Sequence, residues 1–115
     1  MRPLVTLSEK YLRNCQFVYN RYIAMNNLPG NSVIAEVGVL AGDLSAWLLQ
    51  YKKPTELHLI DVYECDDYPI HHRFSRRENE SFVRTRFRKE IDAGQVVIEK
   101  GYSWDMLARH SDHYF

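Results

Sequence analysis

Features that would assign the chain to a specialised class of protein are scarce. There are only two cysteines in 115 residues, Cys15 and Cys65, and because they form no C-x-x-C pair we expect reduced, non-catalytic thiols. Lysine plus arginine equals aspartate plus glutamate, so no net charge would draw the protein to nucleic acid or to an anionic membrane. No stretch approaches the roughly 20 apolar residues of a membrane span, and the first residues, MRPLVTLSEK, lack the apolar core of a signal peptide. We therefore expect a cytoplasmic protein.

The first half of the chain contains alternating helix and strand signals. Thr6 and Glu9 have the spacing of a capping box and are followed by helical periodicity, which predicts a helix over residues 8–25. Pro29 and Gly30 break it, and a short apolar run predicts a strand over 33–37. A helical apolar face predicts a helix over 44–51, and the run ELHLIDV predicts a second strand over 56–62. Two strands joined by a helix indicate a parallel βαβ unit.

The second half continues the alternation after a polar segment, residues 64–77, which we expect to be a loop over the carboxyl ends of the strands. Val83, Phe87 and Ile91 line one face of a predicted helix that ends at Gly94. A third strand over 95–100 and a final helix follow. In that helix we expect Ser103 to be the N-cap, with Trp104, Leu107 and Ala108 facing inward.

The element order α-β-α-β-α-β-α predicts the α/β class, as the first half of a doubly wound parallel sheet. In the strand order 3-2-1-4 of such a sheet, the first strand pairs with a fourth, which the sequence does not provide. The open edge of residues 33–37 predicts either a fragment or a homo-oligomer that covers this edge, with Tyr114 and Phe115 as a candidate cover. We expect a helical segment over 1–27 and a ligand-binding domain over 28–115.

The stretch AEVGVLAGDLS places Gly38 and Gly42 between the first strand and the following helix, as in a binding loop. Asp61 follows Gly38 by 23 residues, at the end of the second strand, where a carboxylate can bind ribose hydroxyls. The loop lacks the G-x-G-x-x-G pattern of dinucleotide sites, Leu40 fills the space a pyrophosphate needs, and Asp43 puts a carboxylate at the helix N-terminus. A ligand with a ribose and no phosphate therefore fits better.

The run Glu36-Val37-Gly38-Val39-Leu40-Ala41-Gly42 resembles the E-x-G-x-x-x-G form of motif I in class I S-adenosylmethionine-dependent methyltransferases, especially the macrocin O-methyltransferase-like and methyltransferase-24-like branch. Pro29-Gly30-Asn31 and Gly101-Tyr102-Ser103 are similar to that branch too, so the resemblance runs from about residue 28 onward. It implies a Rossmann-like three-layer sandwich that binds S-adenosylmethionine and transfers a methyl group to a small-molecule or sugar hydroxyl.

The resemblance also implies roles for individual residues. Gly38 and Gly42 would flank the methionine moiety, Glu36 would support the loop, Asp61 would bind the ribose, and Tyr102 and Ser103 would border the adenine. The expected cofactor-binding set is Glu36, Gly38, Val39, Gly42, Ser45, Asp61, Val62, Gly101, Tyr102 and Ser103. The acidic motif that helps this branch bind Mg²⁺ has no counterpart in the sequence, so Mg²⁺ is expected only in a full-length parent and no catalytic residue is assigned. A non-catalytic nucleotide-binding or assembly module remains the alternative.

Other polar and aromatic groups favour simpler interpretations. His71 and His72 could act as base or ligand and Asp66 and Asp67 could join them around a metal, but no regular spacing fixes them, so we expect a solvated loop. A basic cluster is interpreted as the solvent face of a helix, balanced by Glu78, Glu80 and Glu90, and not as a nucleic-acid contact; it comprises Arg73, Arg76, Arg77, Arg84, Arg86, Arg88 and Lys89. Three aromatic residues are expected in the core: Trp47, Phe87 and Trp104.

Overall fold

The computed structural model describes residues 23–64 and 79–115. The chain divides into two compact units, Met1–Gly30 and Asn31–Phe115. In the first unit the described part is helical over residues 23–25. The rest of the helix expected over 8–25, both cysteines, and the expected loop beyond residue 64 lie outside the described residues. Among the described residues, no helix has the length and apolar character needed to cross a membrane.

A parallel sheet of three strands forms the centre of the second unit, in the order β1 (Val33–Val37), β2 (Glu56–Asp61), β3 (Val96–Lys100). The register aligns Val33 with Glu56 and Leu57 with Val96. Together with its helices the sheet confirms the α/β class and the predicted order of these three strands. Among the described residues β1 pairs with β2 alone, so its other edge has no strand beside it.

The middle strand is buried because neighbours cover both of its edges and both of its faces. Leu57, Leu59 and Ile60 have no exposed surface. Tyr63, just beyond the strand, is also buried and donates a hydrogen bond from its hydroxyl to the carbonyl of Leu59 at 2.8 Å. Burial raises the pKa of this phenol well above its ordinary value, because the charged form would lose its hydration.

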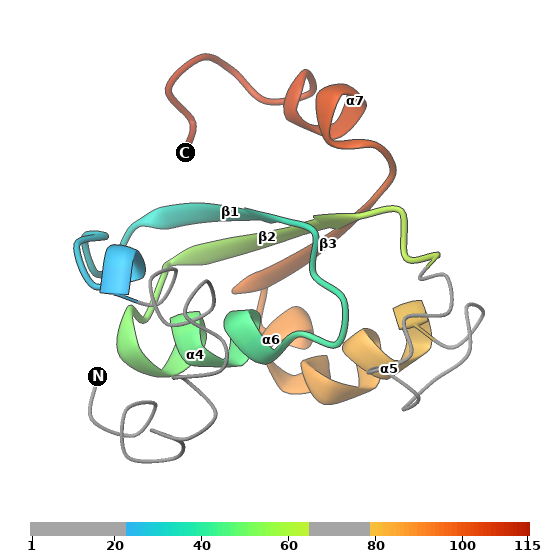
Figure 1. Ribbon diagram of the computed structural model, residues 1–115, viewed down its shortest axis with the longest axis horizontal. Coiled ribbons are helices and arrows are strands. Elements are labelled where there is room, and N and C mark those ends of the chain that lie inside the picture. The colour runs from blue at the N-terminus through green and yellow to red at the C-terminus, as the bar shows by residue number, and fades with distance from the viewer. Residues whose placement is uncertain (1–22, 65–78) are drawn as a thin grey trace. The chain divides into compact units, whose positions relative to one another are not determined.

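Three helices pack against one face of the sheet: α4 (Asp43–Tyr51), α5 (Asn79–Arg86) and α6 (Arg88–Asp92) (Figure 1). The predicted apolar face of α4 is confirmed, since Leu44, Trp47 and Leu48 are buried. The core on this side also includes Ile34, Val83, Phe87 and Val96.

The helix expected to run to Gly94 is interrupted at Phe87. This residue leaves the helical conformation with φ −110° and ψ 22°, which separates α5 from α6. Its ring is buried and packs against Gly42. A Cβ on Gly42 would lie only 2.6 Å from Cε2 of this ring, which is too close for any real contact. The interruption therefore accompanies close packing of Phe87 on the glycine loop, a tertiary contact that periodicity does not reveal.

The opposite face of the sheet carries α7 (Ser103–Leu107) and the segment that follows it (Figure 1). The expected orientation of α7 is wrong: Trp104 is 67% exposed, Leu107 and Ala108 are exposed, and Met106 is buried instead. The N-cap is Tyr102, not Ser103, and no side chain caps the helix. Met106 packs against Gly101, where a Cβ would lie 2.7 Å from its Cε, and this contact sets the rotation of so short a helix.

Candidate functional site

The loop between β1 and α4 has three residues in the left-handed backbone region. Gly38 and Gly42 have φ of 82° and 84°, and Leu40 has φ of 55°. The two glycines differ in their surroundings. A Cβ on Gly42 would collide with Phe87, whereas a Cβ on Gly38 would have nothing within 4 Å. Gly42 is thus required for packing, and Gly38 leaves bare backbone beside open space.

Asp61 holds this loop through its carboxylate. Oδ2 accepts hydrogen bonds from the backbone N–H groups of Val39 at 2.7 Å and Leu40 at 3.2 Å, and Oδ1 accepts one from Tyr63 at 2.9 Å. The end of β2 and the glycine loop therefore meet. A carboxylate has about four acceptor positions, so these bonds leave about one for a ligand unless the loop amides are displaced.

Glu36 and Ser45 tie the end of β1 to the first turn of α4. The Ser45 hydroxyl donates to Glu36 Oε2 at 2.6 Å, and the two residues are 0% and 5% exposed respectively. Val39 is buried as well, at 4% exposure. Of these three expected cofactor-binding residues, none presents an exposed side chain, so their contribution to a ligand site would be to shape the loop.

The end of β3 adds the remaining expected residues. Gly101 donates its backbone N–H to the carbonyl of Asp61 at 2.9 Å, which places the Gly101–Ser103 turn beside the end of β2. Tyr102 is 57% exposed and stacks on Trp104, with ring centroids 4.6 Å apart and planes 6° from parallel. Val62 and Ser103 are half-buried. The carboxyl ends of all three strands thus bring the glycine loop, Asp61 and an exposed aromatic pair into one region.

An open hollow of about 420 Å³ lies elsewhere, beside α4 and the junction of α5 and α6. Its lining includes Arg86, Phe87 and Glu90 but none of the ten expected cofactor-binding residues. The hollow is therefore not the site predicted from the sequence.

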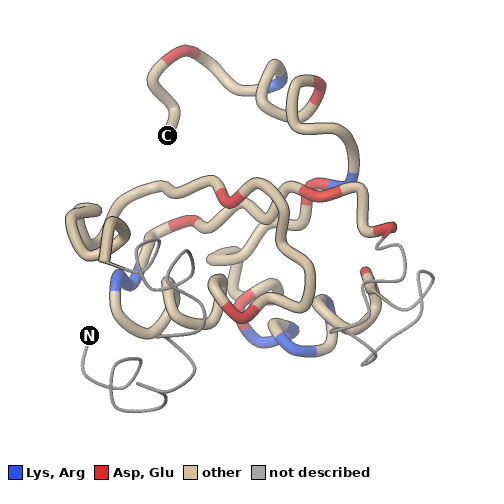
Figure 2. The backbone as a smooth tube through the Cα atoms, in the orientation of Figure 1, with Lys and Arg blue, Asp and Glu red and all other residues tan. Residues whose placement is uncertain are grey.

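Two residues of the basic cluster, Arg84 and Arg86, pair with groups of the same chain. Arg84 meets Glu80 at 3.2 Å, and Arg86 donates to Asp43 at 2.7 Å and to the carbonyl of Ala41 at 2.9 Å. Figure 2 shows Lys and Arg along α5 and α6, on the helical side of the sheet. These ion pairs agree with the expected solvent face of a helix. Further polar residues singled out in this part of the sequence lie outside the described residues: Asp66, Asp67, His71, His72, Arg73, Arg76, Arg77 and Glu78.

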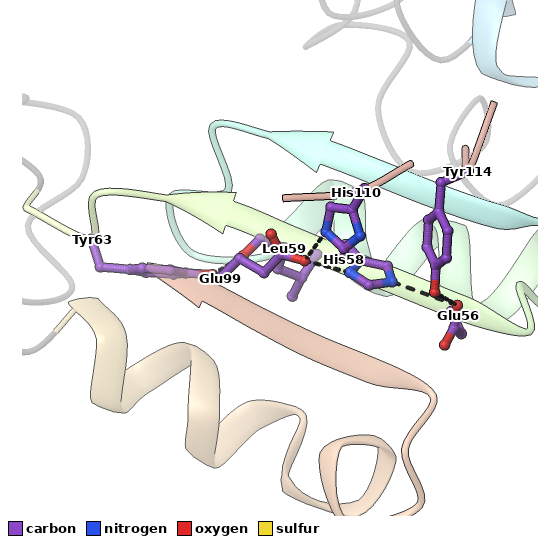
Figure 3. A network of polar contacts seen from close by, with 7 residues as sticks. All are labelled: Glu56, His58, Leu59, Tyr63, Glu99, His110 and Tyr114. Atoms are coloured by element: carbon purple, nitrogen blue, oxygen red, sulfur yellow. Dashed lines mark hydrogen bonds and ion pairs between the residues drawn. The ribbon is translucent and has the colours of Figure 1, made fainter. Parts of the chain in front are cut away.

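A second group of polar residues lies on the sheet face that carries α7, and the sequence analysis missed it. Glu99 Oε1 lies 2.6 Å from His58 Nδ1 and 2.6 Å from His110 Nε2 (Figure 3). The side chains of His58, Glu99 and His110 are 5%, 11% and 18% exposed. Glu56 Oε2 lies 3.6 Å from the other ring nitrogen of His58. We call His58, Glu99 and His110 the His-Glu-His cluster.

Part of this cluster had a signal in the sequence. The register aligns His58 with Val97, and since side chains alternate along a strand, Glu99 lies on the face of His58. Glu56, two residues before His58, shares that face too. A histidine and a glutamate on one face of two adjacent apolar strands could therefore have been noticed. His110 could not, because its position depends on the path of the segment after α7.

The C-terminal residues cover His58. The ring centroids of Tyr114 and Phe115 lie 5.6 and 5.1 Å from that of His58. The Tyr114 hydroxyl donates to Glu56 Oε2 at 2.6 Å. The described contacts of these two aromatic residues are thus with β2 and with His110, on the face of the sheet.

The Tyr114 hydrogen bond should be detectable as a shift in the titration of Glu56. This bond, followed by smaller effects of His58 and His110, lowers the pKa of Glu56 below its ordinary value of 4.5. A lowered pKa in the folded state stabilises the fold above the ordinary pKa, and the contribution is lost as the pH falls through the lowered value. We expect Tyr114→Phe to raise the Glu56 pKa in a carboxyl-carbon NMR titration.

Phe115→Leu is the matched control, because it changes the neighbouring ring and retains the Tyr114 hydroxyl. It should leave the Glu56 pKa lowered. Equal pKa values for Glu56 in the unsubstituted protein and in Tyr114→Phe would show that the hydroxyl does not bond to this carboxylate in solution.

Comparison of the chain with protein-family models, with curated proteins and with solved structures found no match in any of the three.

Proposed function

We propose that the chain binds S-adenosylmethionine at the carboxyl ends of its three strands, as part of a Rossmann-like class I methyltransferase. The observation that carries the proposal is the convergence of the glycine loop, Asp61 and the Gly101–Ser103 turn at the carboxyl ends of the three strands. Ligands of open parallel sheets bind outside the carboxyl ends of the strands, and a carboxylate there suits the two hydroxyls of a ribose.

The charges around the loop support a ligand without a phosphate at this position. Asp43 is the first residue of α4, so its carboxylate lies at the positive end of the helix that a pyrophosphate would otherwise use. Arg86 pairs with Asp43 and also donates to the carbonyl of Ala41, so this cation beside the loop is already engaged. A sulfonium ligand requires no phosphate site, and its positive charge favours a site with a local carboxylate.

The proposed ligand contacts follow from exposure. Gly38 offers backbone next to open space for the methionine part, and Tyr102 offers an exposed ring for the adenine. Asp61 would bind the ribose with its remaining acceptor position, or after exchange of a loop amide for a ribose hydroxyl. Four of the expected residues would hold the loop in shape: Glu36, Val39, Gly42 and Ser45. Three others would line the site beside Asp61: Val62, Gly101 and Ser103.

The proposed reaction is methyl transfer from S-adenosylmethionine to a hydroxyl of a small molecule or a sugar. An in-line approach of the acceptor oxygen to the sulfonium methyl is required, together with a base or a metal such as Mg²⁺ that assists loss of the hydroxyl proton. The proposal assigns neither of these roles to a described residue, and it concerns the cofactor-binding part of the enzyme.

Calorimetric titration with S-adenosylmethionine, S-adenosylhomocysteine and NAD tests the proposal. We expect the first two to bind more tightly than NAD. Tyr102→Ala should raise their Kd by about fivefold or more, since stacking of a base on an aromatic ring contributes about 1–3 kcal/mol. Tyr102 is exposed, so this substitution should leave the fold intact. Tyr51→Ala, at the end of α4 remote from the loop, is the control and should leave Kd unchanged. Tighter binding of NAD, or no binding of any of the three, would contradict the proposal.

A non-catalytic assembly module is the second candidate, and two observations favour it. The Asp61 carboxylate already makes three hydrogen bonds within the chain, and β1 has one edge with no described partner strand. This candidate predicts no affinity in the titrations above and association of the chain through the β1 edge. Calorimetry and sedimentation at micromolar concentration together separate the two candidates. Binding of S-adenosylmethionine would favour the methyltransferase, whereas self-association without such binding would favour the assembly module.

A further inference from the structure

The His-Glu-His cluster joins three segments that are far apart in the sequence. His58 comes from the middle of β2, Glu99 from β3, and His110 from the segment after α7. Each residue offers one nitrogen or oxygen atom, and these three atoms all lie within 4.8 Å of one another. Among the residues that the structure describes, this is the group whose donor types and spacing suit a metal ion.

We propose that His58, Glu99 and His110 bind one Zn²⁺ ion, which fastens the segment after β3 to the face of the sheet. Two imidazoles and one carboxylate are a known protein ligand set for zinc, with a water molecule as the fourth ligand. The proposal is independent of S-adenosylmethionine binding, because the cluster contains none of the residues proposed to contact that cofactor.

The present distances are close to those that an ion requires. Zinc lies about 2.0–2.2 Å from nitrogen and oxygen ligands, so in a tetrahedral site the ligand atoms are about 3.3–3.6 Å apart. The two contacts to Glu99 Oε1 are 2.6 Å each, so they would open by about 1 Å or less to admit the ion. His110 is the most exposed of the three side chains and lies on the segment after α7, not on a strand, so it is the ligand with the most freedom to adjust.

The atoms around the cluster are arranged as a metal site needs them. If Nδ1 of His58 binds the ion, Nε2 carries the proton, and this nitrogen faces Glu56 Oε2 at 3.6 Å. A carboxylate beside the second ring nitrogen is the usual support of a zinc-bound histidine. Glu99 Oε2 is buried without a hydrogen-bond partner and would accept a hydrogen bond from the zinc-bound water.

A purely hydrogen-bonded cluster is the competing interpretation, and it leaves more buried polar atoms without partners. Glu99 Oε1 would accept a hydrogen bond from each histidine, and this arrangement leaves His58 Nε2 and Glu99 Oε2 buried without hydrogen-bond partners. Buried polar groups without partners are uncommon because they lose their hydration and gain nothing in return. Zinc binding gives Glu99 Oε2 a partner in the zinc-bound water, whereas His58 Nε2 faces Glu56 at 3.6 Å in either interpretation.

The expected consequence of the ion is a fixed path for the segment after β3. Gly101 and Tyr102 lie between two ligands, Glu99 and His110, so the ion would close this segment into a short loop against the sheet. Tyr114 and Phe115 pack on His58 and His110 and would shield the site from water.

Titration of the metal-free protein with Zn²⁺, followed by calorimetry and by thermal unfolding, tests the proposal. We expect one ion per chain and a Zn²⁺-dependent rise in melting temperature, because an ion that binds only the folded state stabilises it. His110→Asn and Glu99→Gln should each raise the Kd for Zn²⁺ at least about tenfold. Two variants are used because Glu99 is the more buried ligand and its substitution affects folding more.

His113→Asn is the matched control, since it removes an exposed histidine three positions from His110 and asparagine tolerates its positive φ of 63°. It should bind Zn²⁺ as the unsubstituted protein does. Titration with Co²⁺ in place of Zn²⁺ distinguishes the His-Glu-His cluster from a site on the cysteines. Binding to Cys15 or Cys65 would produce a thiolate charge-transfer band in the absorption spectrum. The proposal is overturned by absence of Zn²⁺ binding, by equal affinity in His110→Asn, or by a thiolate band.

Discussion

Replacing Gly42 by alanine should lower the free energy of unfolding by about 2–5 kcal/mol. Gly42 has φ of 84°, and a side chain in the left-handed region costs about 1–2 kcal/mol. The new Cβ would also lie 2.6 Å from Cε2 of Phe87, and overpacking of a buried ring typically costs about 1–3 kcal/mol. The Phe87 ring is 3% exposed and lies under Arg86, 5.5 Å from its guanidinium carbon, so it has little room to move.

Gly38→Ala is the control for this effect. Gly38 has nearly the same φ, 82°, but a Cβ there meets no atom within 4 Å. We expect a loss of only about 1–2 kcal/mol, from backbone strain alone. Urea denaturation of both variants measures the difference. Equal losses would show that Phe87 does not pack on Gly42 in solution and that the interruption between α5 and α6 has another cause.

Asp61→Ala should destabilise the protein by about 2–4 kcal/mol, whether or not a cofactor binds. The substitution removes a carboxylate that accepts hydrogen bonds from the backbone of Val39, Leu40 and Tyr63. A hydrogen bond to a charged group contributes about 1.5–3 kcal/mol, and the three are not additive because the freed amides gain partial access to water. Amide hydrogen exchange at Val39 and Leu40 should accelerate more than exchange in the middle of β2.

Asp43→Ala provides the comparison at the other end of the same loop. Asp43 is 63% exposed and its described partner is Arg86, so loss of this surface ion pair should cost only about 0.2–1 kcal/mol. Asp61→Asn should lie between the two, because the amide retains one acceptor oxygen. A loss for Asp61→Ala no larger than that for Asp43→Ala would mean that the carboxylate is free in solution, and Asp61 would then be fully available to a ribose.

Gly42→Ala and Asp61→Ala separate structural from ligand-binding roles in and around the glycine loop. Gly42 and Asp61 are expected to matter for the fold itself, whereas Gly38 and Tyr102 border space that a ligand could occupy. A binding defect in Asp61→Ala would therefore have two causes at once. For this reason the exposed Tyr102 is the better probe of the proposed cofactor site.

Much of the architecture could be predicted from local pattern. β1 matches its predicted bounds, and the helix after it was predicted to within one residue, because a short apolar run and a helical apolar face are properties of neighbouring residues. The meeting of the glycine loop with Asp61 was predictable as well, since parallel strands bring their carboxyl ends to one edge of a sheet. The hydrogen bonds of the Asp61 carboxylate to the backbone of Val39 and Leu40 were not predictable, because they depend on the path of the loop after Gly38.

The wrong predictions share a physical cause. A five-residue helix such as α7 has too few residues to define an apolar face. Its orientation therefore follows the packing of Met106 on Gly101 and not the helical spacing that predicted Trp104 to face inward. Phe87 was correctly expected in the core, but its departure from helical geometry accompanies packing on a residue from a distant part of the chain, Gly42.

The sequence by itself determined the order of strands and helices, the positions of the turns and the strand ends at which polar residues gather, because each depends on residues close together in the chain. Only the tertiary structure decided which polar side chains meet. His58, Glu99 and His110 are brought together by the register of β2 with β3 and by the return of the chain after α7 across the sheet. Such contacts depend on the summed geometry of several elements, which no local periodicity encodes.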